Sequence, residues 1–172
     1  CDISTLKCSS VLPEIAGSEL EGPLLLAYPT MDDNSDGNIS QEEVDAYTGH
    51  IVLRTKGISS ISGIENFKIM THLYLESNNI SDISPLSNLI ELKNLALSNN
   101  PIGDISELSN LTNLRYLYLS NTGITNISAL AGLTNLGTLN LTSNPDLCIS
   151  DVNELSDTLG IYIYSNGVDT SC

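Results

Sequence analysis

The sequence has few basic residues, no tryptophan and a single phenylalanine. Lys and Arg together number 6 against 21 Asp and Glu in 172 residues, which gives a formal net charge of -15 at pH 7. Such a charge repels phosphate backbones and anionic lipid surfaces, so we expect no nucleic-acid partner. No segment approaches the roughly 18 consecutive apolar residues of a membrane helix, so we expect no transmembrane segment. With 41% hydrophobic residues, the chain is too apolar for a disordered acidic tail.

The short motifs that accompany catalysis are also missing. The sequence contains no G-x-S-x-G, no Walker loop, no H-E-x-x-H and no glycine-rich dinucleotide fingerprint. We therefore predict that the protein is not an enzyme.

Acidic residues are concentrated near the N-terminus. Residues 1–47 hold ten of the 21 carboxylates and a single base, Lys7. This change in composition predicts two regions, an N-terminal cap over residues 1–47 and a less acidic region from residue 48 onward.

From residue 48 the sequence repeats every 22 residues without a gap. We number positions within lines that begin at residues 48, 70, 92, 114 and 136, with a truncated sixth line from 158. The fourth and sixth positions are aliphatic in every line: Ile51, Leu73, Leu95, Leu117, Leu139 and Ile161, then Leu53, Leu75, Leu97, Leu119, Leu141 and Ile163. The ninth position reads Lys56, Asn78, Asn100, Thr122, Asn144 and Asn166.

This pattern, L-x-x-L-x-L-x-x-N, is that of a leucine-rich repeat. It predicts an α/β solenoid, a right-handed coil with a concave parallel β-sheet and a convex side of 3₁₀ turns or short helices. The ninth-position Asn can satisfy backbone groups of two successive coils, which predicts an Asn ladder. Five repeats over residues 48–157 share one core, and residues 158–172 form a truncated repeat or C-terminal cap.

Residues 32–43 match the twelve-residue calcium loop of an EF-hand, D-x-[DN]-x-[DN]-G-x5-E. Gly37 occupies the position of the sharp turn. The predicted Ca²⁺ ligands are Asp32, Asn34, Asp36, Asn38 through its carbonyl, Ser40 and a bidentate Glu43. The alternative interpretation is an Asp/Asn-rich turn that binds nothing.

The residues that flank this loop predict one well-supported helix, whereas an EF-hand loop normally lies between two helices. Ser40 can cap a helix from about Gln41 to Tyr47 that ends at Gly49, whereas Pro23 and Pro29 confine an incoming helix to little more than residues 24–28. The two methionines provide no Met-rich groove, so we interpret the calcium as structural and not regulatory.

A repeat such as LKNLALSNNPIGDISELSNLTN, residues 92–113, after a small acidic cap resembles the internalin-type leucine-rich repeat proteins of bacterial surfaces. The resemblance implies an EF-hand-like helical cap and a concave sheet that grips a host or neighbouring protein. The family cap has generally lost its calcium ligands, whereas this sequence keeps them. We expect no sorting tail or immunoglobulin-like extension after the repeats, so we do not carry over the family's mode of attachment.

Four cysteines, Cys1, Cys8, Cys148 and Cys172, allow three pairings. Cys148 and Cys172 fall at positions 13 and 15 of successive lines, so stacking brings them together and predicts a disulfide. Cys1 and Cys8 would then pair at the N-terminus, and this usage is typical of an oxidising compartment. In an alternative, Cys1 is the lipid-modified first residue of a bacterial lipoprotein, which leaves Cys8 unpaired.

Strand positions 2, 3, 5, 7 and 8 are predicted to point away from the core, and we call this surface the sheet face. On this numbering, five of the seven tyrosines lie there, with Tyr162 at position 5 and Tyr164 at position 7. Tyr and Arg are enriched at binding hot spots. The predicted partner-binding residues are His72, Tyr74, Lys93, Arg115, Tyr116 and Tyr118.

His50 and His72 are the only histidines and are expected about 5 Å apart on adjacent coils. The alternatives are a Zn²⁺ shared with Glu76 and a pH-sensitive contact, but an ordinary surface ladder is the preferred interpretation.

Together these features predict a secreted, periplasmic or surface-held monomer that recognises a protein partner through the sheet face. A glycan-binding module and a passive spacer within a larger surface protein are the alternatives.

Overall fold

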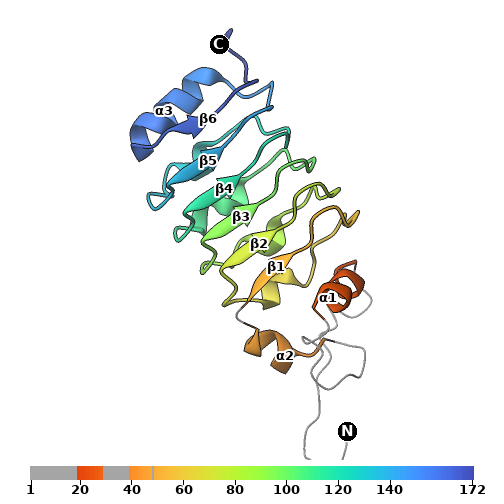
Figure 1. Cartoon of the computed structure of the whole chain (residues 1–172). Helices are drawn as coiled ribbons and strands as arrows, with labels where there is room; N and C mark the ends of the chain where they lie inside the picture. The colour runs from red at the N-terminus through yellow and green to blue at the C-terminus, as the bar shows by residue number, and fades with distance from the viewer. Residues whose placement is uncertain (1–18, 29–38, 48) are drawn as a thin grey trace, which may run out of the picture.

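The computed structural model describes residues 19–28, 39–47 and 49–172. Two short helices, α1 (Glu21–Ala27) and α2 (Gln41–Ala46), precede a parallel sheet in which strand order follows chain order (Figure 1). The strands of the described chain are β1 (His50–Val52), β2 (His72–Tyr74), β3 (Asn94–Ala96), β4 (Tyr116–Tyr118), β5 (Thr138–Asn140) and β6 (Ile163–Tyr164). The predicted leucine-rich repeat solenoid is confirmed.

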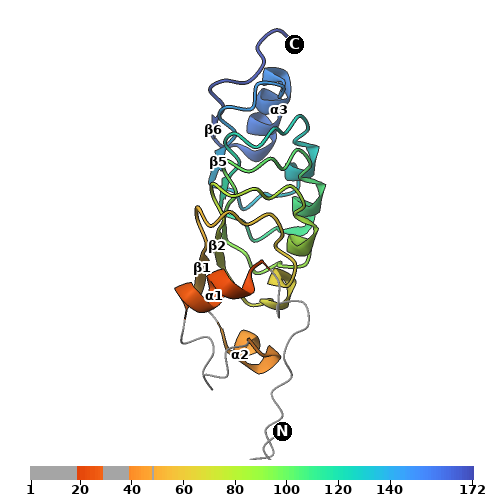
Figure 2. The same cartoon turned by 90° about the vertical axis from the view of Figure 1, so that its right-hand side faces the viewer.

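Short return segments form the side of the solenoid opposite the sheet (Figure 2). The first four returns contain the 3₁₀ helices η2 (Ile64–Asn66), η3 (Ser84–Leu86), η4 (Ser106–Asn110) and η5 (Ser128–Leu130). The fifth contains the α-helix α3 (Ile149–Leu159). No helix within the described ranges is long and apolar enough to cross a bilayer.

The aliphatic columns of the repeat form one continuous core. The side chains of Leu73, Leu95, Leu117 and Leu139 are fully buried, and they are paired in register along the sheet. Full burial of a leucine contributes about 1.5–3 kcal/mol, and each coil shares this burial with its neighbours.

The Asn ladder is also confirmed. The side-chain amide of Asn100 donates to Leu75 O and Leu97 O, both at 2.9 Å, and its Oδ1 accepts from Ile80 N at 3.0 Å. Asn78 and Asn144 make the equivalent bonds one or two coils away. Each buried amide therefore ties the carbonyl groups of two successive coils together.

The last coil is two residues out of the 22-residue register. β4 and β5 pair Leu117 with Leu139, but β5 and β6 pair Leu139 with Ile163, 24 residues later. The fourth-column residue of the last coil is thus Ile163, and the prediction of Ile161 is wrong. The α-helical return explains the difference, because an α-helix rises about 1.5 Å per residue against about 2.0 Å for a 3₁₀ helix, and α3 needs more residues to span the same side.

The same shift removes Asn166 from the ladder. Its carbonyl accepts from Ser143 N at 2.7 Å, just as the carbonyl of Thr142, a seventh-position residue, accepts from Asn121 N at 3.0 Å. Asn166 is therefore a seventh-position residue, and the prediction that it continues the ladder is wrong.

The helices of the cap differ in detail from the sequence prediction. α1 begins at Glu21, earlier than expected, because Pro23 lies in the first helical turn, where a missing N–H costs no intrahelical bond. α2 ends at Ala46, and Tyr47 caps it in an extended conformation. Gly49 does not end this helix; it makes room for the Tyr47 ring, which would lie 2.6 Å from a Cβ at that position.

Hydrogen bonds from Tyr28, Tyr47 and Glu19 join the described part of the cap to the first coil. Val52 N on the outer edge of β1 donates to the Tyr28 hydroxyl at 2.6 Å, and the Tyr47 hydroxyl donates to His50 O at 2.8 Å. The carboxylate of Glu19 accepts bonds from Ser59 and Ser60. These contacts cover the first edge of the sheet, which would otherwise expose unpaired backbone groups.

Candidate functional site

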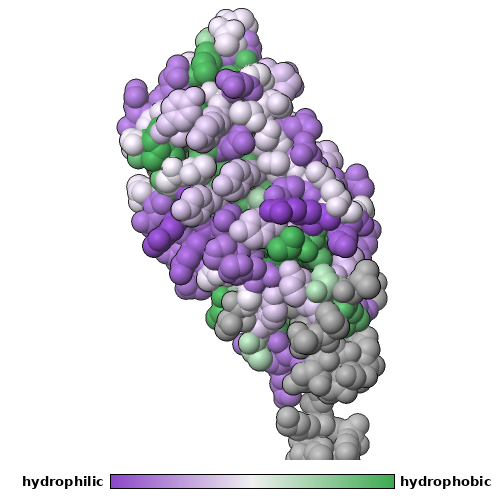
Figure 3. Space-filling view, in the orientation of Figure 1, coloured by the Kyte–Doolittle hydropathy of each residue, from purple (hydrophilic) through white to green (hydrophobic). Residues whose placement is uncertain are grey.

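The sheet face is the outward surface of β1–β6, and it faces the viewer in Figure 1. Along β1 and β4 the burial alternates, so that the middle residue is in the core and its two neighbours point outward. Figure 3 shows this surface as mostly hydrophilic to neutral in hydropathy, with small hydrophobic patches. It is a polar, partly aromatic surface, which differs from the aliphatic core on the other side of the sheet.

His50 and His72 stack on adjacent strands at the first end of the sheet face. Their ring centroids are 3.8 Å apart, which confirms the expected proximity. Thr71 Oγ1 lies 2.8 Å from His72 Nδ1 and fixes the orientation of that ring. Burial lowers the pKa of His72 below its usual range, and the neighbouring His50 and Lys93 lower it further. His72 thus gains a proton less readily than a free histidine.

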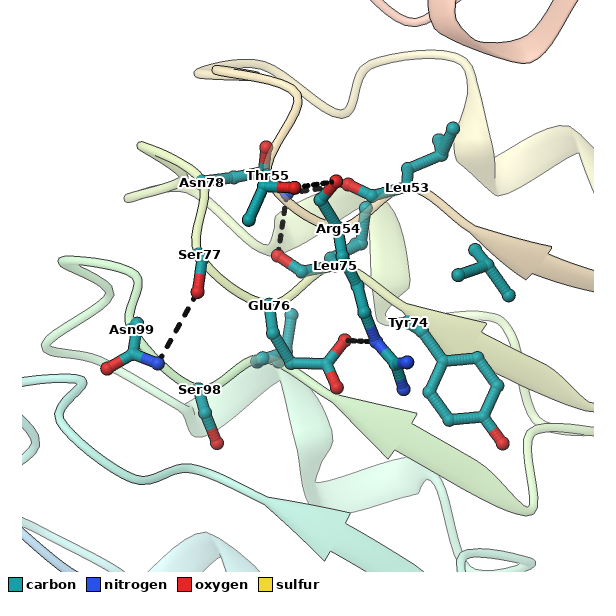
Figure 4. A network of polar contacts seen from close by, with 12 residues as sticks. Leu53, Arg54, Thr55, Tyr74, Leu75, Glu76, Ser77, Asn78, Ser98 and Asn99 are labelled. Atoms are coloured by element: carbon teal, nitrogen blue, oxygen red, sulfur yellow. Dashed lines mark hydrogen bonds and ion pairs between the residues drawn. The ribbon is translucent and has the colours of Figure 1, made fainter. Parts of the chain in front are cut away.

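Arg54, Tyr74 and Glu76 form a second cluster (Figure 4), and the Tyr74 ring centroid lies 6.5 Å from that of His72. Arg54 Nε is 2.8 Å from Glu76 Oε2, and its guanidinium carbon lies 4.7 Å from the centroid of the Tyr74 ring. The Tyr74 hydroxyl accepts from Asn94 Nδ2 at 3.1 Å. Tyr74 is therefore held by a cation over its ring and by an amide at its hydroxyl.

Tyr116 and Tyr118 lie on β4 and form the centre of the sheet face. Tyr116 is 46% exposed and Tyr118 is half-buried. Ala96, at the fifth position between Tyr74 and Tyr118, is only 2% exposed, because a small residue there lies below the level of its larger neighbours.

Lys93 and Arg115 are exposed at the second position, just before β3 and β4. The Arg115 N–H donates to Lys93 O at 2.8 Å, so the two residues are direct neighbours across the sheet. Neither forms an ion pair with any residue in the described part of the chain. Like charges side by side on neighbouring strands are unfavourable, and no carboxylate in residues 19–28, 39–47 or 49–172 is paired with them.

Tyr162 and Tyr164 end the sheet face at the other edge. The corrected register moves Tyr162 to the third position and Tyr164 to the fifth, in place of the predicted fifth and seventh. Their rings meet edge to face at 5.1 Å, and they are 74% and 51% exposed.

The structure does not assemble the zinc site considered from the sequence. The proposed third ligand, Glu76, is engaged by Arg54 instead. Within residues 19–28, 39–47 and 49–172, no group of three or more His, Cys, Asp or Glu side chains is arranged to hold a metal ion.

Four of the predicted calcium ligands, Asp32, Asn34, Asp36 and Asn38, lie outside the described residues. The remaining two, Ser40 and Glu43, form a capping box at the start of α2. Ser40 N donates to Glu43 Oε2 at 2.7 Å, and Glu43 N donates to Ser40 Oγ at 3.3 Å. These reciprocal bonds hold the Glu43 carboxylate, which is 8% exposed, at the N-terminus of the helix.

Cys148 and Cys172 form the predicted disulfide, with their Cα atoms 5.8 Å apart. The backbone neighbour of Cys148 in the last coil is Asp169, three residues before Cys172. Cys1 and Cys8 lie outside the described residues, so their pairing and the lipid alternative stay predictions.

His50, Arg54 and Asn94 were not among the predicted partner-binding residues, although the structure places them beside His72 and Tyr74. The repeat pattern could have identified them, since all three occupy strand positions that are predicted to point outward. What the columns could not indicate is that these side chains contact one another across the strands.

The stacked coils, the parallel sheet and the Asn ladder define a leucine-rich repeat protein. The family model described as "Leucine Rich repeats (2 copies)" matches residues 70–110 and 112–157, and the chain belongs to this family. Within the family it is internalin-like. No curated protein sequence matches it significantly.

Several solved structures share this fold. An internalin (inlF) from Listeria monocytogenes is 34% identical, with a TM-score of 0.79 over 95% of this chain. The chain spans about half of that protein, 47% of its length. Internalin C2 (inlC2) from the same organism is 29% identical, with a TM-score of 0.76, and the match covers 95% of this chain and 74% of that one. A leucine-rich repeat protein of Leptospira interrogans, 23% identical with a TM-score of 0.56, shares the fold over 62% of this chain and 28% of its own.

Proposed function

We propose that this protein is an extracellular or surface-held recognition module that binds a protein partner through the sheet face, centred on Tyr74, Arg115, Tyr116 and Tyr118. The observation that carries the proposal is the collection of five of the seven tyrosines on one outward surface of a rigid sheet. Tyrosine contributes a large contact area and loses little conformational entropy on binding, which makes it effective in interfaces.

The ordered environment of these residues supports the proposal. Tyr74 is positioned by Arg54 and Asn94 in the free protein, so little ordering remains to be done when a partner binds. The disulfide between Cys148 and Cys172 is typical of proteins in oxidising compartments, which supports a location outside the cytosol. The internalin relatives from Listeria monocytogenes are consistent with such a location.

The test is a pull-down of a partner from cell-surface extracts of the source organism and of the cells around it. The native chain is compared with the triple variant Tyr74→Ala/Tyr116→Ala/Tyr118→Ala. The matched control is Ile69→Ala/Ile90→Ala, which removes exposed apolar area outside the sheet face. All three proteins must first show comparable melting temperatures.

We expect the native chain and the isoleucine control to capture the same protein and the tyrosine variant to lose it. Equal capture by all three would move the site away from the sheet face. Capture of a glycan would show that the partner is a carbohydrate and not a protein. If the native chain captures nothing, the result favours a passive spacer.

We also propose that residues 32–43 bind one structural Ca²⁺. The loop pattern carries this proposal, and the capping box supports it, because it holds the last two ligand residues, Ser40 and Glu43, in a fixed relation at the start of α2. Calcium titration by calorimetry should detect one site in the native chain. Glu43→Gln should weaken binding strongly while keeping a capping-box acceptor, whereas Glu42→Gln, an exposed neighbour on the same helix, should bind like the native chain.

A further inference from the structure

Basic groups gather along one line of the sheet face. His50 and His72 lie at the third position of β1 and β2, and Lys93 and Arg115 lie at the second position next to β3 and β4. We call these four residues the basic row. They follow one another across the sheet, since His50 pairs with His72, the Lys93 N–H donates to the carbonyl of Thr71 just before His72, and the Arg115 N–H donates to Lys93 O.

The basic row is an exception on a strongly acidic chain. From residue 48 onward the sequence has eleven carboxylates and five bases. The sheet-face positions hold three of those bases but only one carboxylate, Glu76, which is paired with Arg54. No carboxylate of the described chain pairs with Lys93 or Arg115, so their charges face solvent uncompensated.

We propose that the basic row binds a short carboxylate-rich segment of the partner protein, which lies across β1–β4 beside the tyrosines. This inference rests on the proposed function, because it specifies the chemistry of the partner at the same face. Neighbouring strands are about 4.8 Å apart, so β1 and β4 are separated by about 14 Å, which is the length of four to five residues of extended chain. Arg115 can bind a carboxylate through two parallel hydrogen bonds, and Lys93 adds a compact charge.

The charge distribution favours a short acidic segment over a long polyanion. A nucleic acid or a sulfated polysaccharide would extend past the basic row onto the carboxylates that cover the rest of the chain, whose net charge is -15. A protein segment with two or three carboxylates can end where the row ends, and its remaining residues can contact Tyr116 and Tyr118.

Binding should also take up a proton. Among the residues that the structure describes, the groups that face His72 are His50 from β1, Tyr74 on its own strand, Thr71 and, before β3, Lys93, with the Arg54–Glu76 pair farther along the strands. None of these carries an unpaired negative charge, so a bound carboxylate would be the first to stabilise an imidazolium there. The affinity for a carboxylate should therefore rise as the pH falls through the range in which histidine titrates.

The probe is a capped peptide of alternating serine and glutamate, with a serine–glutamine peptide as its uncharged twin. The calcium-supplied full chain is labelled with ¹⁵N and titrated by NMR at low ionic strength. We expect the glutamate peptide to shift the amide signals of His50, His72, Lys93 and Arg115, and the glutamine peptide to leave them in place. We further expect binding to strengthen about threefold or more between about pH 7.5 and about pH 5.5.

Two double variants separate the basic row from bulk charge. Lys93→Gln/Arg115→Gln should weaken glutamate-peptide binding about tenfold, whereas Lys56→Gln/Lys68→Gln, which removes the same charge from exposed positions outside the sheet face, should bind like the native chain. His50→Gln/His72→Gln should abolish the pH dependence. Equal weakening by both lysine-containing variants, or shifts centred outside the row, would overturn the inference.

A heparin-derived oligosaccharide that binds the row more tightly than the glutamate peptide would also overturn it. The capture experiment keeps the two proposals apart. If the tyrosine variant loses the partner but Lys93→Gln/Arg115→Gln still captures it, the proposal of an acidic segment is rejected and the proposed recognition function is retained. If the native chain captures nothing, the recognition function itself fails.

Discussion

Cys148 and Cys172 join the last two coils of the solenoid by a disulfide and lie 24 residues apart in the chain. The backbone makes a parallel contact at the same point, where Cys148 bridges to Asp169 and Ile149 N donates to Asp169 O at 2.9 Å. The disulfide thus reinforces the segment after β6, which has no further coil in the described chain to pack against.

Removal of this disulfide should destabilise the protein. A loop of this length corresponds to about 3 kcal/mol in the chain-entropy model. Cys148→Ser/Cys172→Ser should therefore lower the free energy of unfolding by about that amount, measured by urea denaturation. Comparison with the native chain under a reductant separates the covalent link from the serine replacements. An unchanged unfolding curve would show that the terminal coil is held by its backbone contacts alone.

The Asn ladder should be the most sensitive polar feature of the core. Asn100→Ala would leave Leu97 O and Ile80 N without their side-chain partner and Leu75 O with the bond from Asn78 alone, and we expect a loss of about 3 kcal/mol. Asn100→Thr should cost less, because Thr122 occupies the same column and bonds to Leu119 O at 2.8 Å. Asn88→Ala, at an exposed site, is the control, with an expected change within about 0.5 kcal/mol. Similar losses for Asn100→Ala and the control would contradict the ladder's role.

Calcium should stabilise the cap if residues 32–43 bind it. At a calcium concentration one hundred times the dissociation constant, mass action gives about 2.7 kcal/mol. A chelator should lower the melting temperature of the native chain and of Glu42→Gln, and leave that of Glu43→Gln nearly unchanged. A chelator that shifts none of the three melting curves would reject a calcium contribution to stability.

Glu19 should make the attachment of the cap depend on pH. Its hydrogen bonds from the side chain and backbone of Ser59 and from Ser60 N hold the pKa of the Glu19 carboxyl below its ordinary value of 4.5. The ionised form is favoured in the folded state, so the stabilisation is present above that ordinary value and is lost as the pH falls through the lowered pKa. Glu19→Gln should be less stable than the native chain near pH 7, with a gap that closes in acid.

Thermal melts across this pH range check the prediction. Glu91→Gln, which removes an exposed carboxylate elsewhere, controls for the general effect of acid on a highly negative chain. A gap between Glu19→Gln and the native chain that does not change with pH would contradict the role of the ionised carboxylate.

The 22-residue period was enough to predict most of the fold. It placed Leu73, Leu95 and Leu117 in the core and Asn78, Asn100 and Asn144 in the ladder, because every interior coil repeats the same environment and a single pattern serves all of them. It also placed the tyrosines on the outward face, since side chains alternate along a strand. The periodicity failed only where the environment changes, at α3, whose helical return lengthens the last coil and moves Ile163 into the place predicted for Ile161.

What the sequence by itself determined is the solenoid, the identity of its core columns and the set of residues that point away from it. Those follow from local pattern, because period and alternation decide which side of a strand is buried. Only the tertiary structure decided the relations across coils: the stack of His50 on His72, the contact of Arg54 with both Tyr74 and Glu76, and the position of Lys93 beside Arg115, with no carboxylate of the described residues paired to either. Contacts between side chains 22 residues apart depend on rotamer, register and the space left by neighbours, and these exist only once the coils are stacked.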